Sequence, residues 1–305
     1  MPSWSLVRYP SAATRTPSRV AASACVLASA AILLSSAPAL VPASGLTRAE
    51  AVPLAPARGC LPGFDCDMSQ RIDAVDNYLR TRPGVTGYVL RDRVGGGIYA
   101  NENAEQSVWT ASTIKLAIAV DLLNRARVGA IALGPEDRGL MESMLATSND
   151  QATDVLWNKY AGIDRMAFNN AFRANGMSSL VPQPTNTALY PDWSFQKCTA
   201  ADLDRLMVYA LDHLHPDDRA YLVDRMRSVD YNQHWGVWGA GAQMRPGLKN
   251  GWSAEQGGWV VNSVGFAGPG ERYTLAIMSS LGPDGGYTEG ADTDTKVAQM
   301  LLAGR

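Results

Sequence analysis

The chain has 305 residues, 46% of them hydrophobic, which is enough to bury a substantial core in one large domain or two smaller ones. Its formal net charge of −2 argues against a dominant electrostatic attraction to nucleic acid or to an anionic membrane, so we expect neither as a partner. Only five of its 27 basic residues are lysines, so the position of each lysine is informative.

The N-terminus has the pattern of a secretory signal peptide. Three arginines precede an apolar run over residues 20–34, and the small residues Ala37-Pro38-Ala39 follow it as a cleavage site. The run is shorter than the ~20 residues that a membrane-spanning helix needs, although an uncleaved anchor remains the alternative. We therefore predict a signal peptide over 1–39, a secreted or extracellular protein, and no membrane span after cleavage.

A segment rich in alanine, proline and serine follows, and we predict a linker over 40–67. Cys60 and Cys66 flank turn-forming residues within it, which predicts a small disulfide loop in an oxidising compartment. Cys198 is then left as a free, buried thiol. The three histidines have no metal-ligand spacing relative to the cysteines, so we expect neither a metal nor another cofactor.

Helix and strand patterns then follow in chain order. Residues 68–84 have apolar side chains at helical spacing, and 86–93 with 96–103 resemble a β-hairpin around paired glycines. Residues 111–227 have the periodic apolar positions of a long helical block. Three further strands, separated by glycine-rich turns, and a closing helix are predicted at 244–252, 257–268, 272–281 and 289–304.

This order predicts one antiparallel sheet built from both ends of the chain, with flanking helices and an inserted all-helical lobe. Over 68–305 we expect a single domain, in which 68–110 and 231–305 form an α/β lobe and 111–230 form the helical lobe. Ligand sites favour the seam between two such lobes.

Two serines stand three residues before a lysine, the S-x-x-K pattern of acylating serine hydrolases. Ser112 and Lys115 lie at the start of a strongly apolar helix, where positions i and i+3 share a face, so the ammonium can approach the hydroxyl. A serine at a helix N-terminus also has a free backbone N–H for an oxyanion, and an apolar setting lowers the pKa of a lysine. Ser194 and Lys197 lack this setting, and we expect Lys197 on an exposed loop.

Two further motifs follow in order: Ser148-Asn149-Asp150 between helical segments, and Lys249-Asn250-Gly251-Trp252 on a late strand. Together with Ser112 and Lys115 this series resembles the penicillin-recognising serine hydrolases. Within that superfamily it is most similar to class A β-lactamases and their actinobacterial relatives, over roughly 68–305. The resemblance implies the α+β fold of β-lactamases and transpeptidases, and a catalytic domain over that range.

The resemblance also implies roles for these residues. Ser112 is the acylated nucleophile and Lys115 its base. Ser148 relays a proton to the leaving group, and Lys249 supplies positive charge beside it. The strand with Asn250 and Gly251 pairs with the substrate backbone, the N–H groups of Ser112 and Trp252 form the oxyanion hole, and Trp252 is expected as a wall of the cleft.

Asp150 departs from the family pattern, because an amide is usual there. An asparagine can donate a hydrogen bond to a substrate carbonyl, whereas an ionised aspartate cannot. We expect Asp150 to bind substrate, to pair with Lys115 or Lys249 and raise that lysine's pKa, or to be an exposed residue at a helix start. Asn149 is a poor substitute for the amide that is usual at position 150, because adjacent residues of a helix point about 100° apart around its axis.

The segment 180–197 is a second departure, because it lacks the glutamate that class A β-lactamases use to release the acyl group. Asp192 is its only carboxylate. Asn250 in place of the usual threonine or serine, and the lack of an arginine after the Lys249 strand, are further differences. The acyl-enzyme is therefore expected to persist.

Three functions remain open. The first is a secreted serine hydrolase of the β-lactamase type that acts on β-lactams or related amides and esters. The second is a D,D-peptidase or esterase with little β-lactamase turnover, and the third is a non-catalytic module that binds β-lactams or peptides. The expected partner is a small β-lactam or a peptidoglycan-type peptide, and the expected oligomeric state is a monomer.

Overall fold

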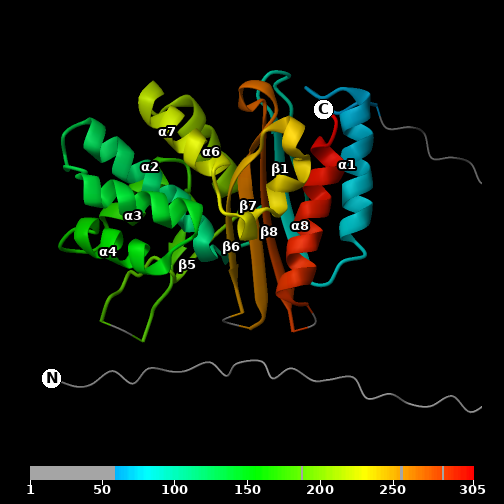
Figure 1. The fold of residues 1–305 in the computed structure, drawn as a ribbon. Coiled ribbons are helices and arrows are strands. Elements are labelled where there is room, and N and C mark those ends of the chain that lie inside the picture. The colour runs from blue at the N-terminus through cyan, green and yellow to red at the C-terminus, as the bar shows by residue number, and fades with distance from the viewer. Residues whose placement is uncertain (1–58, 187, 255–256, 284) are drawn as a thin grey trace, which may run out of the picture. The chain divides into compact units, whose positions relative to one another are not determined.

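The computed structural model describes residues 59–305, except 187, 255–256 and 284. The predicted signal peptide and most of the predicted linker lie outside the described residues. A five-stranded antiparallel sheet forms the centre, in the order β2-β1-β8-β7-β6 (Figure 1). The strands are β1 (Val85–Asp92), β2 (Ile98–Ala100), β6 (Gly247–Ser253), β7 (Trp259–Ala267) and β8 (Tyr273–Gly282).

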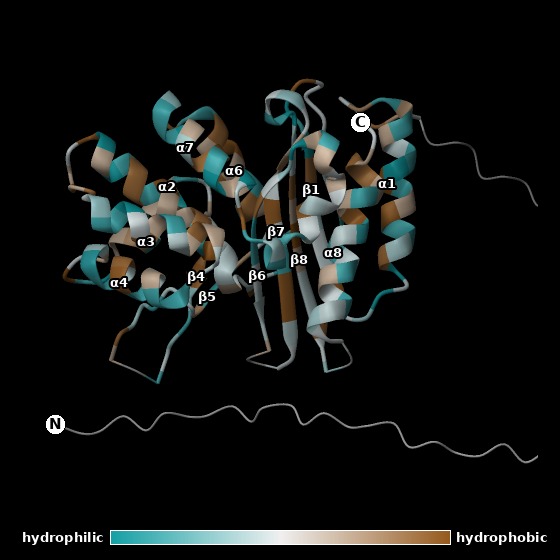
Figure 2. Cartoon of the chain, in the orientation of Figure 1, coloured by the Kyte–Doolittle hydropathy of each residue, from teal (hydrophilic) through white to brown (hydrophobic). Residues whose placement is uncertain are grey.

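The sheet is buried on both faces, which explains why β7 and β8 are almost continuously apolar rather than alternating. Eight of the nine residues of β7 are buried, and helices cover the sheet from both sides. Figure 2 shows hydrophobic residues along the central strands and hydrophilic ones on the outer sides of the helices. Because β6 has only β7 as a strand partner, it is the edge of the sheet that faces the helical lobe.

Two long helices and a short 3₁₀ segment cover one face of the sheet. Helix α1 (Cys66–Leu79) packs beside α8 (Tyr287–Leu302), and η3 (Gly236–Ala240) packs against α8 and β7. Their shared core with the sheet includes Met68, Ile72, Val75, Tyr88, Leu275, Ile277, Val297 and Leu301.

The other face carries the inserted helices, of which α6 packs directly on the sheet. Helix α2 lies at the centre of this lobe, and every residue from 114 to 123 is buried, as its unbroken apolar sequence predicts. The lobe also holds a small sheet in the order β3-β5-β4. The elements are β3 (Val108–Trp109), α2 (Ile114–Arg127), α3 (Pro135–Ala146), α4 (Asp150–Tyr160), α5 (Ala167–Ala174), β4 (Val181–Pro182), β5 (Gln196–Cys198), α6 (Ala200–Asp212) and α7 (Pro216–Arg227).

The predicted fold class is confirmed: the fold is α+β, with one antiparallel sheet built from both ends of the chain and an inserted helical lobe. Cys60 and Cys66 form a disulfide, and Cys198 is a buried free thiol. The prediction that Lys197 lies on an exposed loop is wrong. It lies on β5 opposite Trp109, and its Nζ sits 4.6 Å from the centre of the Trp109 ring, because β3 offers this segment a pairing partner.

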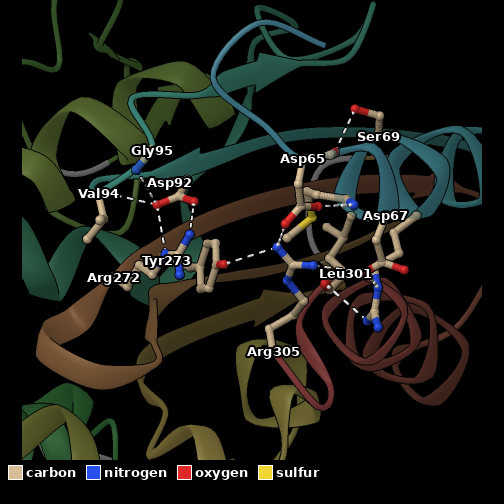
Figure 3. A network of polar contacts seen from close by, with 12 residues as sticks. Asp65, Asp67, Ser69, Asp92, Val94, Gly95, Arg272, Tyr273, Leu301 and Arg305 are labelled. Carbon is tan, nitrogen blue, oxygen red and sulfur yellow. Dashed lines mark hydrogen bonds and ion pairs between the residues drawn. The ribbon is translucent and has the colours of Figure 1, made fainter. Parts of the chain in front are cut away.

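A polar network ties the last residue of the chain to the start of α1 (Figure 3). The Arg305 guanidinium donates to Asp65 and, at 2.9 Å, to Asp67. Asp65 also caps α1, since its carboxylate accepts from the Met68 N–H at 2.8 Å. In the same view Arg272 pairs with Asp92 at 2.7 Å. These contacts join the disulfide loop, α1 and the C-terminus into one structural unit.

Candidate active site

Ser112 lies in a tight 3₁₀ turn, η1 (Ala111–Thr113), that leads directly into α2. The preceding residue, Ala111, has a positive φ of 44°, a backbone conformation that non-glycine residues rarely adopt and that is common at functional sites. Thr110 does not cap this turn through its side chain; instead the Thr113 hydroxyl donates to the Thr110 carbonyl at 2.6 Å. The Ser112 side chain is therefore held, partly exposed, where the sheet meets the helical lobe.

An asparagine on β7 attaches this turn to the central sheet. The buried Asn262 amide donates to the carbonyls of Trp109 at 2.9 Å and Thr110 at 3.2 Å, and its oxygen accepts from the Ser279 N–H. The sequence contains no motif that marks Asn262, because its contacts depend on tertiary packing.

Lys115 is fully buried in the first turn of α2, and its ammonium points at the start of α4. It donates to the Ser148 carbonyl at 2.7 Å, to the Ser148 hydroxyl at 3.3 Å and to the Asp150 carboxylate at 2.5 Å. An ammonium has three N–H donors, so these three acceptors use all of them. No hydrogen bond joins Lys115 to Ser112, and among the described residues the Ser112 hydroxyl makes none, so the expected approach of the two groups stays a prediction.

A second lysine also donates a hydrogen bond to the Ser148 hydroxyl, and it comes from the central sheet on the other side of the seam. Lys249, buried on β6, donates to the Ser148 hydroxyl at 2.9 Å and to its neighbour's carbonyl, that of Asn250, at 2.8 Å. Ser148 itself has a positive φ of 58°, which turns its hydroxyl toward both ammonium groups. Two lysines from different lobes therefore share one serine hydroxyl.

Asp150 begins α4, and the residue before it caps the helix. The Asn149 oxygen accepts from the Ala152 N–H at 2.9 Å, so this side chain serves the helix end, in line with the expectation that it is a poor substitute for an amide at 150. The expected pairing of Asp150 with a lysine is present, and its partner is Lys115.

The pKa values of both lysines are lowered. Burial lowers the pKa of Lys115, and the hydrogen bond and charge of Asp150 offset part of that effect. The Lys249 pKa falls well below its ordinary value because of burial, with a further decrease from the charge of Lys115. Pairing with Asp150 does raise the pKa of Lys115, as predicted. Burial lowers that pKa by more, so the net shift is downward.

Gly251 makes the closest approach between the sheet and the Ser112 turn. A Cβ at this position would lie 2.7 Å from the Ser112 nitrogen and 2.6 Å from the Thr113 nitrogen. A side chain at this position would collide with the backbone of the Ser112 turn, which explains why the residue is a glycine. This contact holds β6, at the residue before Trp252, directly against the backbone N–H groups of Ser112 and Thr113.

The side chains of Asn250 and Trp252 point away from the two lysines, which bears on the expectation that Trp252 is a wall of the cleft; the backbone pairing expected of the strand with Asn250 stays a prediction. Alternation along β6 sends them to the other face of the sheet from Lys249 and Gly251. The fully buried Asn250 amide donates to the Gln233 carbonyl at 2.9 Å and accepts from the Ser263 hydroxyl at 2.7 Å. The Trp252 ring packs on Trp235 and Tyr287, so it is not a wall beside Ser112.

Trp193 is a neighbour of the site that no sequence motif indicated. Its ring centre lies 4.8 Å from the Lys115 Nζ, and its indole N–H donates to Asp154 at 2.7 Å. Asp154 lies one helical turn after Asp150. An aromatic ring thus covers the side of Lys115 that faces the segment 180–197.

Asp192, the only carboxylate of that segment, is engaged locally. Its Oδ1 accepts from the backbone N–H and the hydroxyl of Ser194, at 2.8 and 2.7 Å. These bonds make Ser194 part of a local turn, which agrees with the interpretation that its S-x-x-K match is accidental. Within the described residues, no three His, Cys, Asp or Glu side chains gather where they can hold a metal ion.

No model of a known protein family matches the chain. Proteins from Mycobacterium tuberculosis and Mycobacterium bovis, both named "Putative lipoprotein LppW", are 30% identical to it over 271 residues, which is 85% of this chain and 83% of theirs.

Among solved structures, an ancestral class A β-lactamase, GNCA, aligns with a TM-score of 0.61 at 19% identity, over 77% of this chain and 98% of its own. A β-lactamase from Xanthomonas campestris aligns with a TM-score of 0.63 at 16% identity, over 77% of this chain and 97% of its own. At such identities the likeness establishes the fold, which is that of class A β-lactamases. In the part of the chain that is described, no helix is long and apolar enough to cross a membrane.

Proposed function

This chain belongs to the LppW family and has the fold of class A β-lactamases, and from that premise we propose that it is an exported serine hydrolase. The proposed reaction forms an acyl-enzyme at Ser112 with a β-lactam or a related amide or ester. The observation that carries the proposal is the convergence of Lys115 and Lys249 on the Ser148 hydroxyl, beside the strained turn that holds Ser112.

The lowered pKa values support a role for the lysines in proton transfer. A neutral Lys115 keeps two N–H donors, for the Ser148 carbonyl and Asp150, and gains a lone pair. Its longest contact, 3.3 Å to the Ser148 hydroxyl, is the one most easily reversed, so that this hydroxyl donates to Lys115. A neutral Lys115 no longer lowers the pKa of Lys249 through its charge, and the Asp150 carboxylate raises that pKa, so Lys249 is the lysine that we assign the proton. Its ammonium supplies positive charge beside the leaving group.

In the proposed mechanism Ser112 attacks the substrate carbonyl and its proton passes to Lys115, either directly or through Ser148. The N–H groups of Ser112 and Trp252 hold the negatively charged oxygen of the tetrahedral intermediate. The tight contact of Gly251 with the Ser112 turn supports this pairing of N–H groups. Ser148 then delivers the proton to the leaving nitrogen or oxygen.

Release of the acyl group is proposed to be slow. The Trp193 ring lies against Lys115, and the Asp192 carboxylate is bonded to its own turn, so neither supplies a base for the hydrolytic water. This arrangement favours a peptidase- or esterase-like enzyme with little β-lactamase turnover over an efficient β-lactamase.

Export is proposed on two grounds, namely the N-terminal signal-peptide pattern and the description of the LppW relatives as lipoproteins. The Cys60–Cys66 disulfide is consistent with an oxidising compartment.

Intact-protein mass spectrometry after exposure to benzylpenicillin tests the proposal. Opening of a β-lactam expels no atoms, so the expected adduct adds the whole mass of the antibiotic and decays slowly. The adduct should be absent in Ser112→Ala and present in Ser194→Ala, the control with the accidental S-x-x-K match. An adduct that survives Ser112→Ala would overturn the assignment of the nucleophile.

A further inference from the structure

Asp150 differs from the other polar groups of the candidate site in its exposure. Its side chain is 69% exposed, whereas the side chain of its partner Lys115 is fully buried. Only Oδ1 contacts the lysine. Among the described residues Oδ2 makes no hydrogen bond, so the Asp150 carboxylate offers an accepting oxygen to solvent or to a ligand.

This carboxylate lies at the edge of the group of side chains around Ser148. The Lys115 ammonium that holds Asp150 at 2.5 Å also lies 3.3 Å from the Ser148 hydroxyl, and Lys249 lies 2.9 Å from that hydroxyl on the other side. A substrate that reaches from Ser112 to the Ser148 hydroxyl then lies next to the Asp150 carboxylate, because Ser148 and Asp150 bind the same ammonium. The helix start is itself capped by Asn149, so the Asp150 carboxylate is not needed for that purpose.

A carboxylate at this point discriminates between chemical groups. It accepts hydrogen bonds and does not donate them, so a substrate carbonyl or carboxylate placed against it is repelled. An amine or ammonium group donates to it and gains a charge-assisted hydrogen bond. Lys115 does not cancel this preference, because in the neutral form proposed above it carries no charge, and its two N–H groups serve the Ser148 carbonyl and Asp150.

We propose that Asp150 is a specificity-determining residue that binds a free amino group next to the scissile carbonyl, so that the preferred substrates are aminoacyl esters or amides rather than N-acylated ones. This inference rests on the proposed function and names the substrate class of the same site.

Glycine thiophenyl ester and N-acetylglycine thiophenyl ester are suitable probes, because they differ only in the amino group and have no chiral centre. Attack by Ser112 forms the ester bond of the acyl-enzyme and breaks the C–S bond, and the serine proton leaves with thiophenol. Water then hydrolyses the acyl-enzyme to glycine or N-acetylglycine and restores the serine hydroxyl. Released thiophenol reports acylation even when the second step is slow.

The experiment compares rates of enzyme-dependent thiophenol release, given as kcat/KM or as the rate constant of a single-turnover burst, for both esters near pH 7. There the amino group of the free ester is largely protonated. We expect the protein to prefer the free-amine ester by about tenfold or more, as a charge-assisted hydrogen bond allows. In Asp150→Asn, whose amide can also face a carbonyl, the preference should fall to near unity or reverse.

Asp154→Asn is the matched control, because it removes the same charge one helical turn away and keeps an acceptor for the Trp193 indole. It should retain the preference of the unmodified sequence, which separates a contact at Asp150 from a general effect of negative charge. Circular dichroism checks that all variants are folded.

The outcomes separate this inference from the proposed function. Release that persists in Ser112→Ala, or no release from either ester together with no benzylpenicillin adduct, overturns the proposed function and the inference with it. No release from either ester by a protein that does form the adduct overturns the inference alone. Release that depends on Ser112 but shows no preference for the free amine, or a preference unchanged in Asp150→Asn, overturns the inference alone.

Discussion

At the scale of single residues, the contact of Gly251 with the Ser112 turn leaves no space for a methyl group. We expect Gly251→Ala to lower acylation at least about tenfold, because the Cβ would displace the backbone N–H groups at 2.6–2.7 Å and thus the oxyanion site. The rate of thiophenol release measures the effect. Gly139→Ala, in α3 where a Cβ meets open space, should keep full activity and a stability equal or higher. Equal rates in both variants would contradict the role given to this contact.

The charge of Asp150 should also set the pH dependence of acylation. Asp150 raises the pKa of Lys115 while burial lowers it, and Asp154 and Lys249 are the other charged groups that act on the pair. In Asp150→Asn the Lys115 pKa should fall further, so the neutral amine persists to lower pH. The acidic limb of the pH–rate profile should therefore shift to lower pH, with a smaller shift in Asp154→Asn. A shift to higher pH in Asp150→Asn would rule out Lys115 as the base.

Sequence reasoning at this scale identified the residues but not all of their orientations. The motifs located Lys115, Ser148 and Lys249, and the pairing of Asp150 with Lys115 was among the alternatives. The direction of Trp252 follows from strand alternation relative to Lys249 and was within reach of the sequence. The position of Trp193 was not, because it depends on the path of a loop with no regular pattern.

At the scale of secondary-structure elements, the packing of α8 on β8 buries a carboxyl group. Asp294 is fully buried and accepts from the Ser279 hydroxyl at 3.0 Å, and Ser279 in turn contacts Thr86. Burial raises the pKa of Asp294 well above its ordinary value. Since the folded state keeps this proton to higher pH than the unfolded chain does, the contribution of Asp294 to stability falls as pH rises above about 4, until the raised pKa is passed.

Asp294→Asn removes this titration while keeping a similar shape. The difference in melting temperature, variant minus unmodified protein, should therefore be larger at pH 8 than at pH 5. Thermal unfolding followed by circular dichroism at both pH values gives the comparison, and other titrating groups cancel in the difference between the two proteins. The same difference at pH 5 and pH 8 would mean that Asp294 has an ordinary pKa.

Elements were the best-predicted level of the structure. The apolar run after Ser112 forms the buried helix α2, and Thr199 caps α6 as its position before an apolar period suggests. The pairing of β5 with β3, which moved Lys197 from a loop to a strand, joins segments almost ninety residues apart. Short pairings of this kind depend on tertiary contacts, which local propensity does not encode.

At the scale of the whole molecule, the disulfide and the Arg305 network fasten the two ends of the described chain together. Closure of the short loop between Cys60 and Cys66 corresponds to about 2 kcal/mol in the chain-entropy account. The double variant Cys60→Ser/Cys66→Ser should therefore melt about 4–8 °C lower in a thermal scan. Acylation of the folded variant should be unchanged, because the segment 60–66 contributes no contact to Lys115 or Ser148. A loss of acylation in the folded variant would contradict the view that the disulfide serves stability and not the site.

The order of strands and helices predicted the whole-molecule architecture, because a sheet built from both chain ends is the simplest arrangement for that order. Export is a further prediction at this scale. In an actinobacterial host, the mature protein should begin after Ala39 and appear in the medium. A lipid-modified N-terminus at Cys25, detected by mass spectrometry of the cell-bound protein, would contradict cleavage at that site.

The central claim is that Ser112 is the residue that becomes acylated, and mapping the acyl group within the protein tests it most directly. The protein is treated with benzylpenicillin, digested with trypsin and analysed by tandem mass spectrometry. We predict that the penicilloyl group is found on Ser112, within the peptide that ends at Lys115. A penicilloyl group on Ser194, on Ser148 or on any other residue, or an unmodified Ser112 peptide under saturating antibiotic, would contradict the account.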